Sequence, residues 1–336
     1  MTVGRITTSQ IWANSASSIQ AAKARLSKLT DQSSTGLAVS KPSDDPAAAA
    51  SILRVLSQQS AASRYATNIS DGLGWLSTAD ATLTSSEGLV RQASDLAIQA
   101  ANSGTSTPAA RAGIATQLQG IRDDLLSQAN TKYLGRSIFA GASDAANAFD
   151  PQTFEYAYST PPTSGSGTPA AASGTAPTPT TPTPGVSGSV QRRIGSGAGD
   201  TVTVSADGAA AFGSGPDSVF AQLDSVIAAL RSEDYDTDDS TTGPKATVSA
   251  GIGAIQTALT NLSAQHAIVG ANYARMTGAK TQNATTATAL ETQRAGLQDA
   301  DTTKTLLDLK TQELTYQTAL QVTAQVIQPT LMSFLS

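Results

Sequence analysis

The two ends of the chain carry matching amphipathic helical stripes, and between them lies a Thr/Pro/Gly-rich stretch that cannot form a helix. Within each stripe, apolar residues recur at three-and-four spacing, which places them on one helix face. A single helix of this kind is marginal in water, because most of its stability comes from burying that face. We therefore expect the ends to pair with each other or with neighbouring subunits. The predicted assembly interface consists of Trp12, Ile19, Leu26, Leu29, Leu309, Tyr316, Leu320, Ile327, Leu331 and Phe334.

The composition favours thin helical bundles over a compact enzyme. Only 4% of the 336 residues are aromatic, whereas Ala, Ser, Thr and Gly are abundant. Small residues let helices approach closely along a long seam, but they supply little volume for a large globular core. The predicted fold is mainly α with a small β element, in the form of an elongated antiparallel helical bundle or coiled coil built from both chain ends.

Charge and cysteine content exclude several classes of function. The formal net charge of −5 argues against a nucleic-acid partner, which requires a basic face. The absence of cysteine removes disulfides, thiolate metal sites and cysteine nucleophiles. Residues 1–18 lack the continuous apolar core of a signal peptide, and no run is long enough to span a bilayer. We expect no membrane insertion, and any export must use a route without a cleaved signal of this kind.

Composition shifts along the chain divide it into three parts. The stretch from Thr175 to Gly185 repeats Thr and Pro, which favours a solvated polyproline II conformation. We predict a terminal helical assembly domain from residues 1–41 and 301–336, a helical bundle with a β-hairpin from residues 42–150 and 190–300, and an exposed insertion at residues 151–189.

Local signals predict several element boundaries. The first helix should end near Gly36, and a second helix should begin with Ser43 or Asp44 as its cap and Pro46 in its first turn. A helix should also run from Pro108 to about Ala129.

Three further boundaries are expected in the second half of the chain. Residues 201–205 alternate and are followed by Asp207-Gly208, a strong signal for a hairpin turn. The longest stripe, residues 252–297, contains polar interruptions at which we expect fraying or a bend. A phase shift near Leu306 predicts a separate last helix. The polar interruptions are Lys280, Asn283 and Arg294.

The sequence contains few side chains that could form a catalytic or metal-binding site. His266 is the only histidine, and it lies on the apolar seam of a predicted helix, so we expect a structural ring hydrogen-bonded to a neighbouring helix. The acidic stretch 234–238 has oxygen ligands at calcium-loop spacing, but Asp239 stands where an EF-hand needs Gly and Lys245 where it needs Glu. We predict no catalytic, cofactor-binding or metal-binding residue, and therefore no enzyme.

Three segments of the sequence resemble the flagellin superfamily, and within it the hook-associated branch. Residues 41–49 (KPSDDPAAA) are similar to the family signature that follows the first helix, and residues 133–141 (YLGRSIFAG) are similar to its Gly-Arg-Tyr-Leu-Phe-Ala-Gly region. Residues 327–335 resemble the Leu-rich terminus of the family. The residues that carry the two motifs are Pro42, Ser43, Asp44, Asp45, Pro46, Gly135, Arg136, Phe139 and Gly141.

The resemblance implies a structural role in the bacterial flagellum. It implies a coaxial terminal domain that orders on assembly, with a bundle-and-β domain outside it. The subunit would form, with copies of itself, a junction layer between hook-associated protein 1 and the flagellin filament. It would be exported through the flagellar type III apparatus with the help of an export chaperone, and would therefore be extracellular without a cleaved signal peptide.

Other functions stay open at this point. The nearest alternative is flagellin, the bulk filament subunit, although Pro42, Pro46 and residues 139–141 favour the junction protein. A secreted enzyme on a helical stalk would need an active domain in the insertion, whose sequence is too simple for that. A secreted coiled-coil adhesin predicts a signal peptide, which residues 1–18 do not provide.

Overall fold

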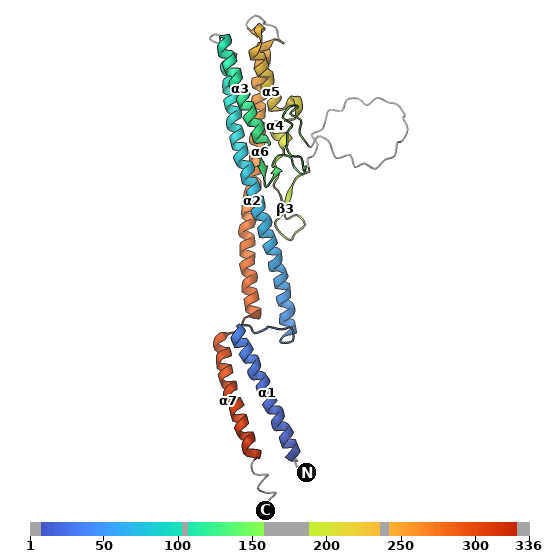
Figure 1. Cartoon of the computed structure of the whole chain (residues 1–336), viewed down its shortest axis with the longest axis vertical. Coiled ribbons are helices and arrows are strands. Elements are labelled where there is room, and N and C mark those ends of the chain that lie inside the picture. The colour runs from blue at the N-terminus through green and yellow to red at the C-terminus, as the bar shows by residue number, and fades with distance from the viewer. Residues whose placement is uncertain (1–7, 103–106, 158–187, 236–241, 328–336) are drawn as a thin grey trace, which may run out of the picture. The chain divides into compact units, whose positions relative to one another are not determined.

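A computed structural model describes residues 8–102, 107–157, 188–235 and 242–327, which are mainly helical (Figure 1). Within these ranges, no helix has both the length and the apolar character needed to cross a membrane. The main elements are α1 (Thr8–Thr35), α2 (Pro46–Ala101), α3 (Pro108–Ala129), β1 (Lys132–Tyr133), β2 (Arg136–Ser137), β3 (Gln191–Arg193), β4 (Thr201–Thr203), α4 (Gly208–Phe212), α5 (Val219–Arg231), α6 (Pro244–Gln298) and α7 (Thr302–Ile327).

The chain forms two compact units, and both contain residues from the two halves of the sequence. The first unit, which we call the terminal unit, combines Met1–Ser63 with Thr285–Ser336. The second, the bundle unit, comprises Arg64–Ala284. Since α2 and α6 each contribute to both units, these contact boundaries lie inside long helices. The domain limits predicted near residues 41 and 301 instead coincide with breaks between helices, and they stay a prediction.

In the terminal unit, α1 and α7 lie side by side and run antiparallel (Figure 1). The unit contains a second small contact, where Val55 and Ala62 of α2 pack against Leu290 of α6. Beside this cluster, Gln59 Nε2 donates a hydrogen bond of 2.8 Å to Glu291 Oε2. Among the described residues of this unit, the buried apolar side chains are Ile52, Val55, Ala62 and Leu290, whereas the α1–α7 contact is made by half-buried side chains.

Two segments of the terminal unit, which we call the connectors, join its helices: residues 36–45 link α1 to α2, and residues 299–301 link α6 to α7. Backbone hydrogen bonds hold the two connectors together. Gly36 ends α1 with a φ of +71°, a conformation that Gly adopts without steric cost, so this predicted boundary is confirmed. The amide of Ala38 then donates to Gln298 O at 2.7 Å, and the amide of Ala300 donates to Gly36 O at 2.8 Å. Leu37 and Asp299 form an antiparallel bridge between them.

In the bundle unit, α2 and α6 pack with α3 and α5 around an apolar seam. The seven-residue repeat of α2 is fully buried at every position from Ile69 through Ala97. Leu118 and Leu125 of α3 and Leu262 of α6 are also fully buried. The α3 helix has the predicted bounds, with Thr107 as its N-cap and Pro108 in its first turn. The α6 helix continues through its three polar interruptions without fraying.

An aromatic cluster holds the loops of the bundle unit together. The ring of Phe149 contacts Phe212 and Phe220, with centroid separations of 5.8 and 5.4 Å. Phe154 and Tyr156 are buried in the same cluster, although they lie within the predicted exposed insertion. Residues 158–187, which make up most of that insertion, lie outside the described residues.

The predicted hairpin turn at Asp207-Gly208 was wrong. Strand β4 pairs with the upstream strand β3, with Arg192 opposite Val202, so its partner precedes it in the chain. Asp207 instead caps α4, where its Oδ1 accepts a hydrogen bond from the Ala210 amide. Asp before Gly suits both a tight turn and a helix N-cap, and the local sequence does not distinguish them.

Candidate assembly interface

The predicted terminal stripes face each other in the α1–α7 pair. Ile19, Leu26 and Leu29 of α1 are half-buried, as are Leu309 and Tyr316 of α7. These side chains lie where each helix approaches the other, and Gln312 Nε2 donates to Ala22 O at 3.2 Å across the seam. The contact is one seam of a two-helix pair, so it leaves most of each helix surface in water.

The α1–α7 pair also exposes large apolar side chains that the seam does not cover. Two of the predicted interface residues, Trp12 and Leu320, are 47% and 43% exposed. Also on α7, Leu307 and Leu314 are 68% and 66% exposed and stand seven residues apart. In an isolated pair such a face gains nothing from water, whereas packing against another apolar surface would stabilise it.

A shallow groove runs between the two helices of the pair. Its volume is about 570 Å³. Apolar side chains contribute part of its lining, and hydroxyl and amide side chains contribute the rest. The lining includes Asn14, Ser18, Ile19, Leu314, Thr318 and Val322. The groove therefore presents both hydrogen-bonding and apolar side chains.

Other parts of the predicted interface are not described at the side-chain level. Ile327 is the last residue of α7, and its side chain lies outside the described part. Leu331 and Phe334 also lie outside the described residues. The predicted interface therefore stays a prediction. Sequence reasoning missed Leu307 and Leu314, which lie off the single stripe that was sought but share a seven-residue spacing that could have identified them.

The first family-like motif forms the turn that enters α2. Asp44 accepts hydrogen bonds from the Lys41 amide at 3.0 Å and from the amide and hydroxyl of Ser40. These donors, led by the Lys41 amide, lower the pKa of the Asp44 carboxyl. Lys28 of α1 approaches the other oxygen of Asp44 at 3.4 Å. The turn is thereby fastened to the last part of α1.

The cap of α2 is Asp45, and not Ser43 or Asp44 as predicted. Its Oδ1 accepts hydrogen bonds from the amides of Ala47 and Ala48, at 3.0 and 2.9 Å. Pro46 occupies the first helical position, so the residue immediately before it becomes the cap. Asp44 is left to organise the preceding turn.

The second family-like motif forms the β1–β2 hairpin and its approach to the core. Leu134 and Gly135 occupy its two-residue turn with φ of +50° and +82°, as a type I′ turn requires. Leu134 is 80% exposed at the tip, while Phe139 is fully buried and its carbonyl accepts a 2.6 Å hydrogen bond from Tyr156. Gly141 also has a positive φ, of +58°. These motif residues therefore have local structural roles in this chain.

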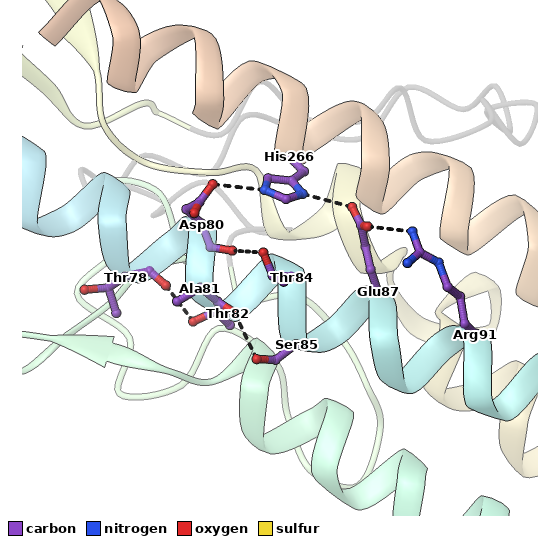
Figure 2. Close-up of polar contacts among 9 residues, drawn as sticks. All are labelled: Thr78, Asp80, Ala81, Thr82, Thr84, Ser85, Glu87, Arg91 and His266. Atoms are coloured by element: carbon purple, nitrogen blue, oxygen red, sulfur yellow. Dashed lines mark hydrogen bonds and ion pairs between the residues drawn. The ribbon is translucent and has the colours of Figure 1, made fainter. Parts of the chain in front are cut away.

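His266 has the structural environment predicted for it. The ring lies between two carboxylates of the neighbouring helix α2 (Figure 2). Its Nδ1 is 3.0 Å from Glu87 Oε1, and its Nε2 is 2.9 Å from Asp80 Oδ1. The carboxylates approach opposite ring nitrogens, so they are not arranged around a common ion. Across the described residues, no group of three or more His, Cys, Asp or Glu side chains is placed to hold a metal.

Comparison with family models matches both ends of the chain to one family. The model for the bacterial flagellin N-terminal helical region matches residues 6–144. The model for the bacterial flagellin C-terminal helical region matches residues 252–335. The two models together include α1, α2, α3 and the β1–β2 hairpin on one side, and most of α6 with α7 on the other.

Two curated proteins and two solved structures are similar to the chain. Flagellar hook-associated protein 3 of Salmonella typhimurium is 37% identical over 153 residues, and that of Escherichia coli is 31% identical over 153 residues. Each alignment covers 45% of this chain and 48% of the relative, so the match spans about half the length of these relatives.

The structural matches cover more of the chain. The structure of a flagellar hook-associated protein from Vibrio parahaemolyticus is 20% identical with a TM-score of 0.59, over 76% of this chain and 100% of that chain. FlgL of Xanthomonas campestris is 16% identical with a TM-score of 0.54, over 70% and 98%. At these identities the likeness establishes the fold alone.

Proposed function

We propose that this chain, which belongs to the bacterial flagellin family, is a structural subunit of the bacterial flagellum that forms the junction layer between hook and filament. One observation carries the proposal. The two ends that match the flagellin models form a helix pair that exposes large apolar side chains, among them Leu307, Leu314 and Trp12. A face of this kind is stabilised when neighbouring subunits remove it from water.

The hook-side position is supported by the relatives. Both curated relatives are named flagellar hook-associated protein 3. In the proposed arrangement the layer contacts hook-associated protein 1 on one side, flagellin on the other, and further copies of this chain within the layer. The role is mechanical, since the subunit would act through the geometry of its interfaces and would need neither a catalytic residue nor a cofactor.

The proposed location is extracellular, on the flagellum. Delivery would use the flagellar type III export apparatus, without a cleaved signal peptide, and an export chaperone would cover the apolar C-terminal helix before export. The exposed leucines of α7 support this last step, because a free helix with such a face is liable to associate nonspecifically.

The alternative within the same family is flagellin, the subunit of the bulk filament. The matching family models describe the helical regions of bacterial flagellin, so they support flagellin and the junction protein equally. The names of the curated relatives favour the junction role. The two proposals differ in where the protein lies along the flagellum and in how many copies each flagellum contains.

Immunogold electron microscopy of intact flagella with their hooks attached would separate these functions. The antibody should be raised against the bundle unit, Arg64–Ala284. The junction role predicts one narrow band of label where the hook meets the filament. Label along the whole filament would identify a flagellin instead. Absence of label from flagella, with label elsewhere on the cell surface, would contradict both roles and favour a secreted adhesin or a stalked enzyme.

A further inference from the structure

His266 joins α6 to two points on α2 that are seven residues apart. Asp80 and Glu87 lie about two helical turns from each other, and the ring is held between them (Figure 2). The imidazole is 29% exposed, and the Glu87 side chain is more deeply buried, at 12%. A ring bonded at both nitrogens fixes the position of α6 along α2, because sliding in either direction lengthens one of the two bonds.

The arrangement is satisfied only by the doubly protonated ring. A neutral imidazole has one donor and one acceptor nitrogen, so one carboxylate would face a lone pair. The charged groups that the described residues bring to the ring are Asp80 and Glu87 of α2, and Glu87 is in turn paired with Arg91, whose Nη2 is 3.0 Å from Glu87 Oε2. On α6 itself, His266 is the only titratable side chain between Lys245 and Tyr273. With the ring protonated, the two acids and two bases of the cluster have no net charge.

The surroundings of the ring also raise the pKa of His266, which favours its protonated form. Partial burial lowers the pKa of His266, but the hydrogen bonds and negative charges of Glu87 and Asp80 outweigh burial and raise the pKa above its ordinary value of 6.5. The imidazolium is therefore the form that this site stabilises.

The stretch of α2 that carries the two carboxylates has weak helix-forming residues. Five hydroxyls between residues 78 and 86 donate back to the carbonyl four residues earlier, at 2.8–2.9 Å. Such bonds compete with the amide ladder and soften a helix, and Gly88 lies two residues after the last of them. Ala79, Leu83 and Ser86 of this stretch are fully buried, while Asp80 and Glu87 contact α6 through His266. The five hydroxyl residues are Thr78, Thr82, Thr84, Ser85 and Ser86.

We propose that the His266 bridge is a pH-dependent clamp that fixes the register of α6 against residues 78–88 of α2 and loosens when the ring loses a proton. Because the ring binds its second proton more tightly in the folded chain, the stabilisation is complete below the unfolded pKa. It is lost as the pH rises through the higher folded pKa. The clamp acts within the bundle unit and does not depend on the function proposed above.

Two measurements on the full chain test the clamp. Because the chain has one histidine, ring carbon and nitrogen NMR signals report His266 without ambiguity. We expect it to titrate above 6.5. Amide hydrogen exchange, expressed as protection factors, should show residues 78–88 losing about fivefold in protection across that titration, equivalent to one net hydrogen bond. A His266 pKa at or below 6.5, or constant protection, would overturn the proposal.

Variants separate the clamp from general effects of pH. His266→Gln retains one donor but cannot titrate, so residues 78–88 should show no step in protection. Asp80→Asn and Glu87→Gln should each lower the pKa of His266 and shrink the step, which tests the proposal even if His266→Gln folds poorly. Asn68→Ala is the matched control, since it removes an uncharged hydrogen bond of α2 to Arg193 O and should keep the full step. A step of equal size in His266→Gln would contradict the clamp.

Discussion

Replacing Leu314 with aspartate should separate assembly from folding. Leu314 lines the open groove beside the seam with α1 and is 66% exposed, so the isolated chain should tolerate Leu314→Asp with little loss of stability. In the assembled flagellum the same position is proposed to meet a neighbouring subunit. There the variant loses the apolar contact and places a carboxylate in an interface.

The magnitude follows from the exposed fraction of the side chain. Fully burying a leucine is worth about 1.5–3 kcal/mol. With two thirds of Leu314 still exposed, about 1–2 kcal/mol remains for the assembled state to gain. The leucine contact alone thus accounts for a loss of about fivefold to thirtyfold in the equilibrium constant per subunit contact. The buried carboxylate adds to that loss, and the effect recurs at every subunit of the layer.

The assay replaces the native chain by each variant and counts hooks that carry filaments in electron micrographs. Gln256→Asp is the matched control, because it introduces the same charge at an exposed α6 position of the bundle unit. We expect Leu314→Asp to leave bare hooks, and Gln256→Asp to give normal filaments. Both purified chains should retain hydrogen-exchange protection in the bundle unit. Normal filaments on the Leu314→Asp background would refute the argument that this face of α7 is an assembly surface.

Further expectations concern separate parts of the chain. Leu320→Asp should also abolish incorporation while leaving the bundle unit folded, and wild-type numbers of filaments in electron micrographs would count against the predicted interface. Phe149→Ala should lower the free energy of unfolding by about 3–5 kcal/mol, since it empties the centre of the aromatic cluster, and denaturant titration would measure the loss. Asp45→Ala should cost about 1 kcal/mol and raise hydrogen exchange in the first turn of α2, whereas unchanged exchange would mean that another group takes over the cap. Deletion of residues 175–185 should leave filament counts unchanged if that segment is only a solvated insertion, and a loss of filaments would show that it contacts a neighbour.

The features predicted correctly are those that local chemistry decides. Gly36 ends α1 because a positive φ suits a residue without a β-carbon, and Pro108 opens α3 because a first-turn residue needs no amide donor. The seven-residue repeat of α2 is strict enough to predict a buried seam over eight turns. The structural role of His266 followed from its place on such a seam.

The features that were missed depend on partners distant in the sequence. Phe154 and Tyr156 lie beside a low-complexity stretch and give no periodic signal, and they are buried only because Phe149 and Phe220 are brought to them. Asp207-Gly208 could form a hairpin turn only if a downstream strand paired with β4. Because β4 pairs with the upstream strand β3, Asp207 instead caps α4. The second apolar face of α7 escaped notice because one stripe was sufficient to explain a two-helix pair.

The backbone bonds between the two connectors have a mechanical consequence. Gly36 and Ala38 on one connector are bonded to Ala300 and Gln298 on the other, so the chain leaves the α1–α7 pair through a short two-stranded ladder. Tension applied to either terminal helix is therefore shared by both covalent paths, and neither connector can stretch without shearing the bonds between them. The ladder joins the two connectors into a single unit, whose stiffness would depend on a few backbone hydrogen bonds and on the conformation of Gly36.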